Sequence, residues 1–304
     1  MLGPMLDYDI VDVFTSRPFA GNALAVVHGA EQLTDAQLAA LAAEFNLSET
    51  AFPMASRTGA GDYSVRIFTP GGEVPFAGHP SIGTAWVLRR AGRVGTGHVV
   101  QECGIGSVDL QLPEDDGPVQ LSAEPRDRGA PVDAEVVEAV AAAVGLGGAD
   151  VDGLVVVAGC GLSFVYLPVR AAALARARAA VTDLGPLRVG QLAADPVGGI
   201  DVFAVAGTGD RLTVRSRVFC PEVSVPEDPA TGSAALGLGI ALVGTGRLPA
   251  GGGRYHISQG VQMGRPSQLF ARVEAAAGVV TRCHVAGRVA AVASGRIRVP
   301  PPTE

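Results

Sequence analysis

Alternating and helical patterns of apolar residues divide the chain into short strands and a few helices. Residues 9–14 alternate polar and apolar side chains and are followed, after a turn that contains glycine, by the apolar run 25–27, which predicts a β-hairpin. Apolar residues then recur at helical spacing within 38–45, and Thr34 and Gln37 before them have the spacing of a capping box. We therefore expect an amphipathic helix of about three turns after the hairpin.

The remaining patterns alternate between strand-like and helix-like runs in both halves of the chain, which predicts an α+β fold. Further strands are predicted at residues 63–68, within 97–112, and at 154–157, 164–167, 201–206 and 213–219, and further helices at 134–144, 186–194 and 233–243. A stretch that contains glycine and aspartate, residues 145–153, is the favoured boundary between two lobes. We therefore expect an N-terminal domain over 1–148 and a C-terminal domain over 149–304, whose last strand is free to return to the N-terminal domain.

A sequence repeat relates the two halves. Residues 79–85 (HPSIGTA) match residues 228–234 (DPATGSA) at an offset of 228 − 79 = 149. Residues 66–70 (RIFTP) match residues 217–221 (RVFCP) at an offset of 217 − 66 = 151. Because both offsets are close to half the chain length, the repeat indicates a duplicated lobe.

Each copy of the repeat has a glycine and a small hydroxyl residue where a strand is predicted to lead into a helix. Backbone N–H groups at the start of a helix can bind an anion when no side chain is in the way. Two such junctions, related by an internal pseudo-dyad, would meet across a cleft between the lobes and could hold the carboxylate of a small substrate. For either copy alone, proline and glycine could serve only to start the helix. The presence of both copies favours a binding site.

Composition excludes several classes of protein. The chain has 304 residues, of which 48% are hydrophobic, enough for one large core or two medium ones. Its net charge of −7 and its pI near 5.3 argue against nucleic acid as a partner. It has neither a signal-like N-terminus nor an apolar run long enough to span a membrane, which indicates a soluble, cytoplasmic protein.

All 23 basic residues are arginine, so the sequence has no lysine for a pyridoxal phosphate Schiff base, a phosphate-binding P-loop or a Ser-Lys catalytic pair. The five histidines show no metal-binding spacing, so no metal is expected. The four cysteines are scattered, which suggests reduced thiols. Serine hydrolase and dinucleotide-binding motifs are also absent from the sequence.

Three residues are the main candidates for chemistry. Glu49 lies in a mostly uncharged segment between Ser48 and Thr50, a setting that could raise the pKa of its carboxyl group and let it both accept and donate a proton. His79 and Asp228 occupy equivalent positions in the repeat and would face each other across the cleft. The alternatives are a solvated glutamate at a strand edge, a capping histidine and a turn aspartate. Arg66 and Arg217 could equally pair with acidic residues in the sheets, so we leave them out of the site.

Five motifs, in order along nearly the whole chain, resemble the PhzF-like proteins of phenazine biosynthesis, which share the diaminopimelate epimerase fold. The motifs are Asp12-Val13-Phe14-Thr15 through Gly21-Asn22, Leu47-Ser48-Glu49-Thr50-Ala51-Phe52, Phe68-Thr69-Pro70 with Ala77-Gly78-His79-Pro80, Asp228-Pro229-Ala230-Thr231-Gly232-Ser233-Ala234, and Gln259-Gly260 with Met263-Gly264-Arg265-Pro266-Ser267. The resemblance implies two pseudo-symmetric lobes, each a β-barrel-like sheet around a central helix, with a cleft between them. It also implies a homodimer without cofactor or metal.

The resemblance implies roles for particular residues. The proton-transferring glutamate of the family falls on Glu49, and the positions that bind the substrate fall on Gly78, His79, Asp228 and the backbone of Gly232 and Ser233. The best-known reaction of the family isomerises trans-2,3-dihydro-3-hydroxyanthranilate by moving a hydrogen from C3 to C1. A glutamate could perform both halves of this transfer, as base and then as acid.

Two other functions remain open at this point. The first is a racemase or epimerase of an amino acid on the same fold with paired cysteines, although the repeat motifs contain no cysteine at the positions where the resemblance would place them. The second is a non-catalytic protein that binds a metabolite in the same cleft. The joint presence of Glu49, His79 and Asp228 favours the isomerase of a small carboxylate.

Overall fold

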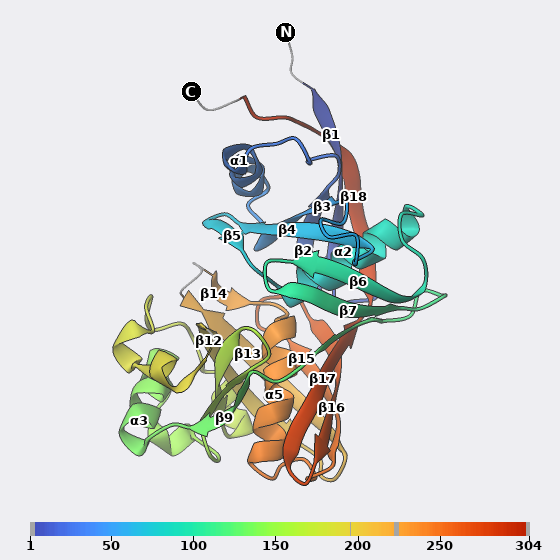
Figure 1. Ribbon diagram of the computed structural model, residues 1–304. Helices are drawn as coiled ribbons and strands as arrows, with labels where there is room; N and C mark the ends of the chain where they lie inside the picture. Colours follow the sequence, from blue (N-terminus) through green and yellow to red (C-terminus); the bar gives the residue numbers. More distant parts are fainter. Residues whose placement is uncertain (1–3, 195, 222–224, 302–304) are drawn as a thin grey trace. The chain divides into compact units, whose positions relative to one another are not determined.

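The computed structural model describes residues 4–194, 196–221 and 225–301 and divides into two compact units (Figure 1). Unit 1 contains the chain up to Leu121 together with the chain from Ala286 onward, and unit 2 extends from Ser122 to Val285. The division does not fall between residues 148 and 149, because residues 145–153 form a turn within unit 2. That turn follows helix α3 (Ala134–Ala143) and contains the short 3-10 helix η1 (Gly148–Asp150).

In unit 1, strands surround one helix and a second helix packs outside. The strands are β1 (Met5–Val13), β2 (Asn22–Val27), β3 (Glu49–Met54), β4 (Tyr63–Thr69), β5 (Gly72–Val74), β6 (Gly97–Cys103), β7 (Gly106–Leu112) and β18 (Val289–Arg298). The helix α2 (Gly78–Arg90) packs against β1, β2, β3, β7 and β18. The antiparallel pairing of β18 with β1 brings the end of the chain back to unit 1.

The predicted hairpin and first helix of unit 1 are confirmed. Strands β1 and β2 pair antiparallel, and helix α1 (Asp35–Phe45) follows them. The Thr34 side chain accepts a hydrogen bond from the backbone of Gln37, and the Gln37 side chain accepts one from the backbone of Thr34, which completes the capping box. Helix α1 ends at Asn46, which has a left-handed backbone conformation.

Unit 2 repeats this architecture around helix α5 (Gly232–Gly244). Its strands are β9 (Asp127–Pro131), β10 (Val156–Gly159), β11 (Ser163–Pro168), β12 (Val197–Ala206), β13 (Arg211–Cys220), β14 (Val225–Asp228), β15 (Gly252–Gln259) and β16 (Ser267–Ala276), while β8 (Val119–Ala123) and β17 (Val279–Gly287) cross between the units. Helix α5 packs against β9, β10, β11, β15 and β16. It is apolar all round, as expected for a helix enclosed by strands.

The sequence repeat corresponds to a structural repeat. Strand β4 pairs antiparallel with β5 and parallel with β6, and strand β13 pairs in the same way with β14 and β15. Arg66 on β4 makes two hydrogen bonds to the carboxylate of Glu73 on β5, and Arg217 on β13 makes two to Glu227 on β14. Both arginines therefore have the structural role that kept them out of the predicted site.

The helix predicted over residues 186–194 is wrong. Two 3-10 helices occupy this stretch, η2 (Gly185–Leu187) and η3 (Val189–Leu192), and Arg188 between them is left-handed with φ 55°. The segment contains Pro186 and Gly190, whose low helix propensities outweigh the apolar periodicity. Val189 is buried and anchors the segment to the core of unit 2.

Gly237 inside α5 allows the hydroxyl of Tyr166 to approach the helix backbone. Tyr166 donates a hydrogen bond to the carbonyl of Ala234, and a side-chain carbon at Gly237 would overlap the Tyr166 hydroxyl. We expect Gly237→Ala to destabilise the protein by about 1–3 kcal/mol, because the tyrosine must move or lose its partner. Gly244→Ala is the matched control, since its side chain would meet nothing within 4 Å. Denaturant unfolding measures the difference, and equal stabilities of the two variants would contradict it.

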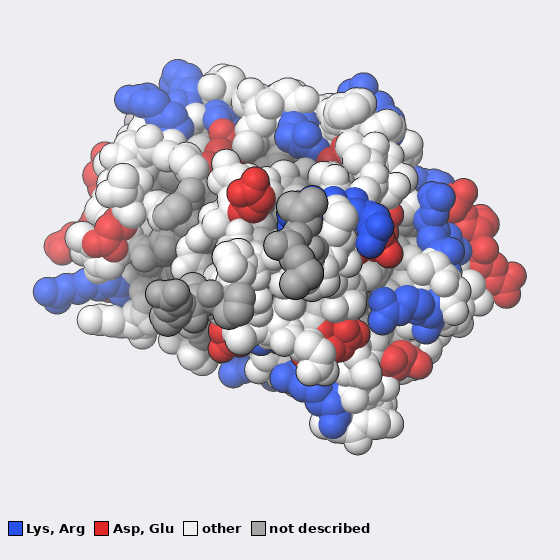
Figure 2. Space-filling view, turned by 90° about the horizontal axis from the view of Figure 1, so that it is seen from above, with Lys and Arg blue, Asp and Glu red and all other residues white. Residues whose placement is uncertain are grey.

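The surface charge and the length of the helices each bear on the classes of partner that the protein can bind. On the face shown in Figure 2, arginine and acidic side chains are interspersed. Such mixing, together with a net charge of −7, gives that face no basic track for a phosphate backbone. Within the described residues, no helix has the length and apolar character that a membrane span requires.

Candidate active site

In unit 1 the strands β2 and β3 and the helix α2 begin near one another, at one end of the sheet. Strands β2 and β3 run parallel, with Leu24 opposite Glu49, so both strands begin at the same edge. Glu49 is the first residue of β3, and Gly78 and His79 are the first two residues of α2. The structure therefore places the predicted unit 1 residues at adjoining segment ends, and it brings Glu49 together with His79.

A chain of polar contacts connects these ends. The Oε2 atom of Glu49 lies 3.4 Å from Nε2 of His79, and Nδ1 of His79 lies 3.2 Å from Nδ2 of Asn22. The Ser48 hydroxyl in turn donates to Oδ1 of Asn22 at 3.0 Å. His79 and Asn22 are 4% and 2% exposed. The contacts fix the imidazole against the carboxyl group of Glu49.

The environment of Glu49 favours its protonated form. Burial raises the pKa of Glu49 from 4.5 to about 7, and the neighbouring Ser48 side chain opposes this rise in part. The buried Oε2 atom has no hydrogen-bond partner within the described residues, although His79 lies near it. A carboxyl group with this pKa can remove a proton in one step and return it in the next near neutral pH.

The hydrogen bond between Asn22 and His79 determines which imidazole nitrogen carries the proton. The amide nitrogen of Asn22 can only donate, so Nδ1 of His79 accepts and the imidazole proton lies on Nε2. Nε2 is the atom that faces Glu49. The arrangement therefore directs an N–H group toward the carboxyl group and stabilises Glu49 when it becomes ionised.

We expect Asn22→Ala to lower turnover about tenfold and to shift the proton of His79 between its two nitrogens, because the amide donor to Nδ1 is lost. Nitrogen NMR of labelled histidine distinguishes the two tautomers. Gln268→Ala, which removes an amide side chain on β16, serves as the control. An unchanged His79 spectrum in Asn22→Ala would contradict the assignment of Asn22 as a positioning residue.

Unit 2 contains the second group of predicted residues. Asp228 is the last residue of β14, and its carboxylate accepts a hydrogen bond from the Thr231 hydroxyl at 2.6 Å. The Gln259 side chain donates to the Asp228 carbonyl at 2.8 Å and accepts from the backbone N–H of Thr231 at 3.2 Å. Gly232 and Ser233 follow as the first two residues of α5, so their backbone N–H groups lie in the unpaired first turn of the helix.

The two copies of the repeat begin their helices at different points, which corrects the prediction that both glycine–hydroxyl pairs lie at a helix start. Gly232 begins α5, whereas Gly83 and Thr84 lie inside α2, which already begins at Gly78. The absence of a side chain at Gly83 serves packing, because a carbon there would lie 2.6 Å from the Leu24 side chain. In unit 1 the first two positions of the helix therefore belong to Gly78 and His79.

Two residues that sequence reasoning left without a role are Asn22 and Gln259. Each is an amide side chain that orients a predicted site residue, His79 in unit 1 and Asp228 in unit 2. Each also adjoins a glycine with positive φ, Gly21 at 67° and Gly260 at 72°. In each lobe an amide residue stands next to a glycine within a family motif. This recurrence in the sequence could have identified Asn22 and Gln259 as candidate site residues.

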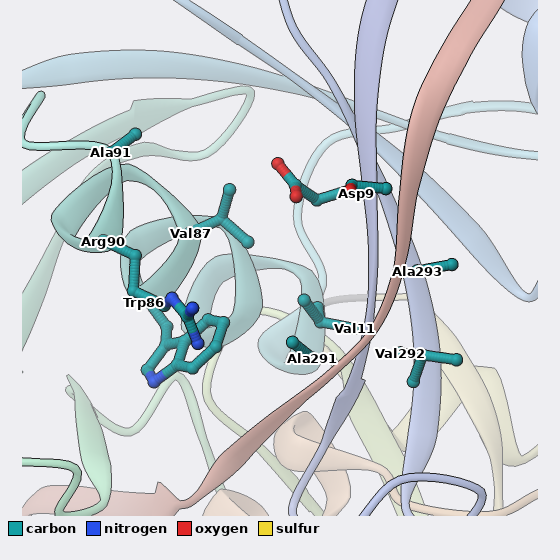
Figure 3. A pocket seen from close by; sticks show the side chains of 10 residues that line it. Asp9, Val11, Trp86, Val87, Arg90, Ala91, Ala291, Val292 and Ala293 are labelled. Atoms are coloured by element: carbon teal, nitrogen blue, oxygen red, sulfur yellow. The ribbon is translucent and has the colours of Figure 1, made fainter.

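Unit 1 also contains a cavity away from these residues. A cavity of about 420 Å³ lies between α2 and strands β1 and β18, and Figure 3 shows the carboxylate of Asp9 on one side and the Arg90 guanidinium against the Trp86 ring on the other. Its lining contains neither Glu49 nor His79. We assign the chemistry to the Glu49 network, because that network holds the buried carboxyl group with the raised pKa.

Comparisons with known proteins agree with the resemblance seen in the sequence. Residues 11–295 match the family model described as phenazine biosynthesis-like protein. The trans-2,3-dihydro-3-hydroxyanthranilate isomerase of Pseudomonas fluorescens is 35% identical over 299 residues, which cover 96% of this chain and 99% of that protein.

Solved structures show the same architecture. A predicted epimerase from Pseudomonas aeruginosa is 31% identical, with a TM-score of 0.79 over 96% of this chain and 99% of that one. A PhzF-family protein of Bacillus anthracis, at 21% identity, has a TM-score of 0.82 over 97% of this chain and 99% of that one. The expected fold of two related lobes is confirmed, with a sheet in each lobe that surrounds a helix.

Proposed function

The chain belongs to the PhzF-like family of phenazine-biosynthesis proteins, and from this premise we propose that it is an isomerase that moves a hydrogen within trans-2,3-dihydro-3-hydroxyanthranilate or a related small carboxylate. The observation that carries the proposal is the Glu49 carboxyl group, 18% exposed and with its Oε2 atom buried, whose pKa of about 7 suits it to accept and donate a proton. His79 lies 3.4 Å from it and supplies an orienting N–H group.

In the proposed reaction, ionised Glu49 removes the proton from C3 of the substrate. The electron pair of that C–H bond moves into the ring, so that C1 becomes basic. Protonated Glu49 then returns the proton to C1, which restores its own ionised form and leaves a product with the same atoms as the substrate. One residue is sufficient for both transfers, and no oxidant or reductant is needed.

We further propose that the substrate is bound by the residues of each unit to which the family resemblance assigns this role. The backbone N–H groups of Gly232 and Ser233 open helix α5, where the helix dipole favours an anion such as the substrate carboxylate. Asp228, held by Thr231, is suited to accept hydrogen bonds from an amine or a hydroxyl group. Gly78 and His79 supply the corresponding first-turn amides in unit 1.

The pairing of strands argues for a single acid–base residue. Thr50 lies opposite Phe68 in unit 1, and Ile200 lies opposite Phe219, the repeat equivalent of Phe68, in unit 2. The residue of unit 2 that corresponds to Glu49 is therefore Gly199, which has no side chain. A racemase that used this same position in both lobes would need a second acid–base group at residue 199, so this comparison favours a hydrogen shift performed by Glu49 alone.

The test is incubation of the protein with trans-2,3-dihydro-3-hydroxyanthranilate in heavy water, followed by absorbance and by mass spectrometry. Turnover with deuterium at C1 supports proton transfer through a group that exchanges with solvent. Binding without turnover favours a metabolite-binding protein and contradicts the isomerase with this substrate. A sample without enzyme controls for spontaneous reaction of the substrate.

We also propose that the protein works as a homodimer, as the family resemblance implies, and that it is located in the cytoplasm. Sedimentation at several protein concentrations tests the dimer, and fractionation of the source cells tests the compartment. A mass equal to that of one chain at all concentrations would overturn the dimer.

A further inference from the structure

The loop between β1 and β2 displays an aromatic side chain in an unusual conformation. Phe19 is 74% exposed, and its φ is 63°, in the left-handed region that bulky residues rarely adopt. Phe14 in the same loop also has positive φ, 65°, but it is fully buried and packs closely against Gly287. Burial of the side chain thus offsets the backbone cost at Phe14, whereas the exposed side chain of Phe19 gains little from burial.

The loop holds this conformation through buried contacts. The backbone N–H of Phe19 donates to Oδ2 of Asp12 at 2.6 Å, and Asp12 is 2% exposed. The Thr15 hydroxyl donates to the carbonyl of Arg17 and accepts from its N–H. Gly21, with φ of 67°, approaches the carbonyl of Val13 so closely that any side chain would overlap it. The backbone that carries the Phe19 ring is therefore held in place before anything binds to it.

The topology places this loop beside Glu49. Strand β1 ends at Val13 and β2 begins at Asn22, so the loop lies at the edge of the sheet where β2 begins. The parallel strand β3 begins with Glu49 at the same edge. Asn22, three residues after Phe19, contacts His79 directly. The strained backbone at Phe19 is thus only three residues away from a side chain that contacts His79. Backbone strain is common close to functional sites.

We propose that the ring of Phe19 forms an apolar wall of the substrate site and selects substrates with a planar or nearly planar ring over acyclic carboxylates. The inference rests on the proposed function. It adds that unit 1 recognises the ring of the substrate as well as the substrate's polar groups. A rigid aromatic side chain loses little freedom on binding and offers a face to a ring. The polar groups at Glu49, His79 and Gly78 would act on the ring substituents.

The experiment compares wild type with Phe19→Asn, Phe19→Ala and Phe19→Tyr. Asparagine tolerates positive φ, so Phe19→Asn removes the ring without a penalty in the backbone. We expect both ring-deleting variants to raise KM for trans-2,3-dihydro-3-hydroxyanthranilate about five- to tenfold with little change in kcat, and Phe19→Tyr to behave as wild type. Phe270→Ala removes a ring from β16 in unit 2, 46% exposed, and serves as the control.

A second readout is calorimetric binding of 3-hydroxyanthranilate, an aromatic analogue without the hydrogen that is moved. We expect its affinity to fall about five- to tenfold in Phe19→Asn and to stay unchanged in Phe270→Ala. Equal KM and affinity in wild type and Phe19→Asn would overturn this inference alone. Loss of self-association in Phe19→Asn with unchanged affinity would assign the ring to a subunit contact and overturn it as well. A wild type that neither turns over nor binds these compounds would overturn the inference and the proposed substrate together.

Discussion

Replacement of Glu49 by glutamine is expected to lower turnover by about 10²–10⁴-fold, the range that a positioned acid–base group contributes, while the fold stays intact. Glutamine has nearly the same shape as the protonated carboxyl group but can neither remove nor return a proton. Burial has already raised the pKa of Glu49 to about 7, so the neutral side chain suits the site as well as the native one. Steady-state kinetics measures the loss of turnover, and circular dichroism measures whether the fold is retained.

The pH dependence of the wild type follows from the same group. The ionised carboxylate is needed to start the reaction, so kcat/KM should rise with pH and level off above the pKa of about 7. Glu44→Gln removes an exposed carboxylate on α1 and controls for the change in net charge. Near-normal turnover of Glu49→Gln would remove Glu49 from the role of base, and a rate that rises around pH 4.5 instead would contradict its raised pKa.

Stability should change in the direction opposite to activity. The pKa of Glu49 is higher in the folded chain than the unfolded value of 4.5, so folding retains a proton that the unfolded chain releases between about pH 4.5 and 7. The folded state therefore loses on the order of 3 kcal/mol from this group as pH rises through that range. Glu49→Gln does not titrate and avoids this loss, which is the usual cost of a functional group in an unfavourable environment.

The sequence was sufficient for the elements that local patterns determine. The hairpin, the capping box at Thr34 and the helix at Gly232–Gly244 all follow from periodicity and capping residues within a few positions of each other. Glu49 and His79 were found through motifs, and the structure then brought them within 3.4 Å. Local patterns and family motifs are therefore sufficient to identify the candidate residues.

What the sequence could not provide depends on contacts between distant segments. Asn22 and His79 are 57 positions apart, and only the packing of β2 against α2 brings the amide to Nδ1 of the imidazole. The raised pKa of Glu49 likewise depends on burial by surrounding segments, which its immediate neighbours do not determine. The helix start at Gly78 was obscured by the repeat motif, because its glycine serves packing in unit 1, as Gly83, and begins the helix in unit 2, as Gly232.

Asp201→Asn is expected to flatten the pH dependence of stability without loss of activity. Asp201 on β12 is 1% exposed, and burial raises its pKa from 3.8 to about 7, while a hydrogen bond from the Ser216 hydroxyl opposes the rise. Below about pH 3.8 the carboxyl group is protonated in both states and contributes no difference. Between about pH 4 and 7 the unfolded chain releases this proton and the folded chain retains it, so the wild type loses on the order of 4 kcal/mol.

Asparagine carries no charge at either pH, so the advantage of Asp201→Asn over wild type should grow from near zero at pH 4 to several kcal/mol at pH 8. Guanidinium unfolding at both pH values measures it. Ser216→Ala is the matched variant, because loss of the opposing hydrogen bond raises the pKa of Asp201 further and steepens the dependence. Parallel stability curves for wild type and Asp201→Asn would show that Asp201 is ionised in the folded protein. Retained turnover in Asp201→Asn, beside its loss in Glu49→Gln, would separate a buried carboxyl group in the core of unit 2 from the one that transfers the proton.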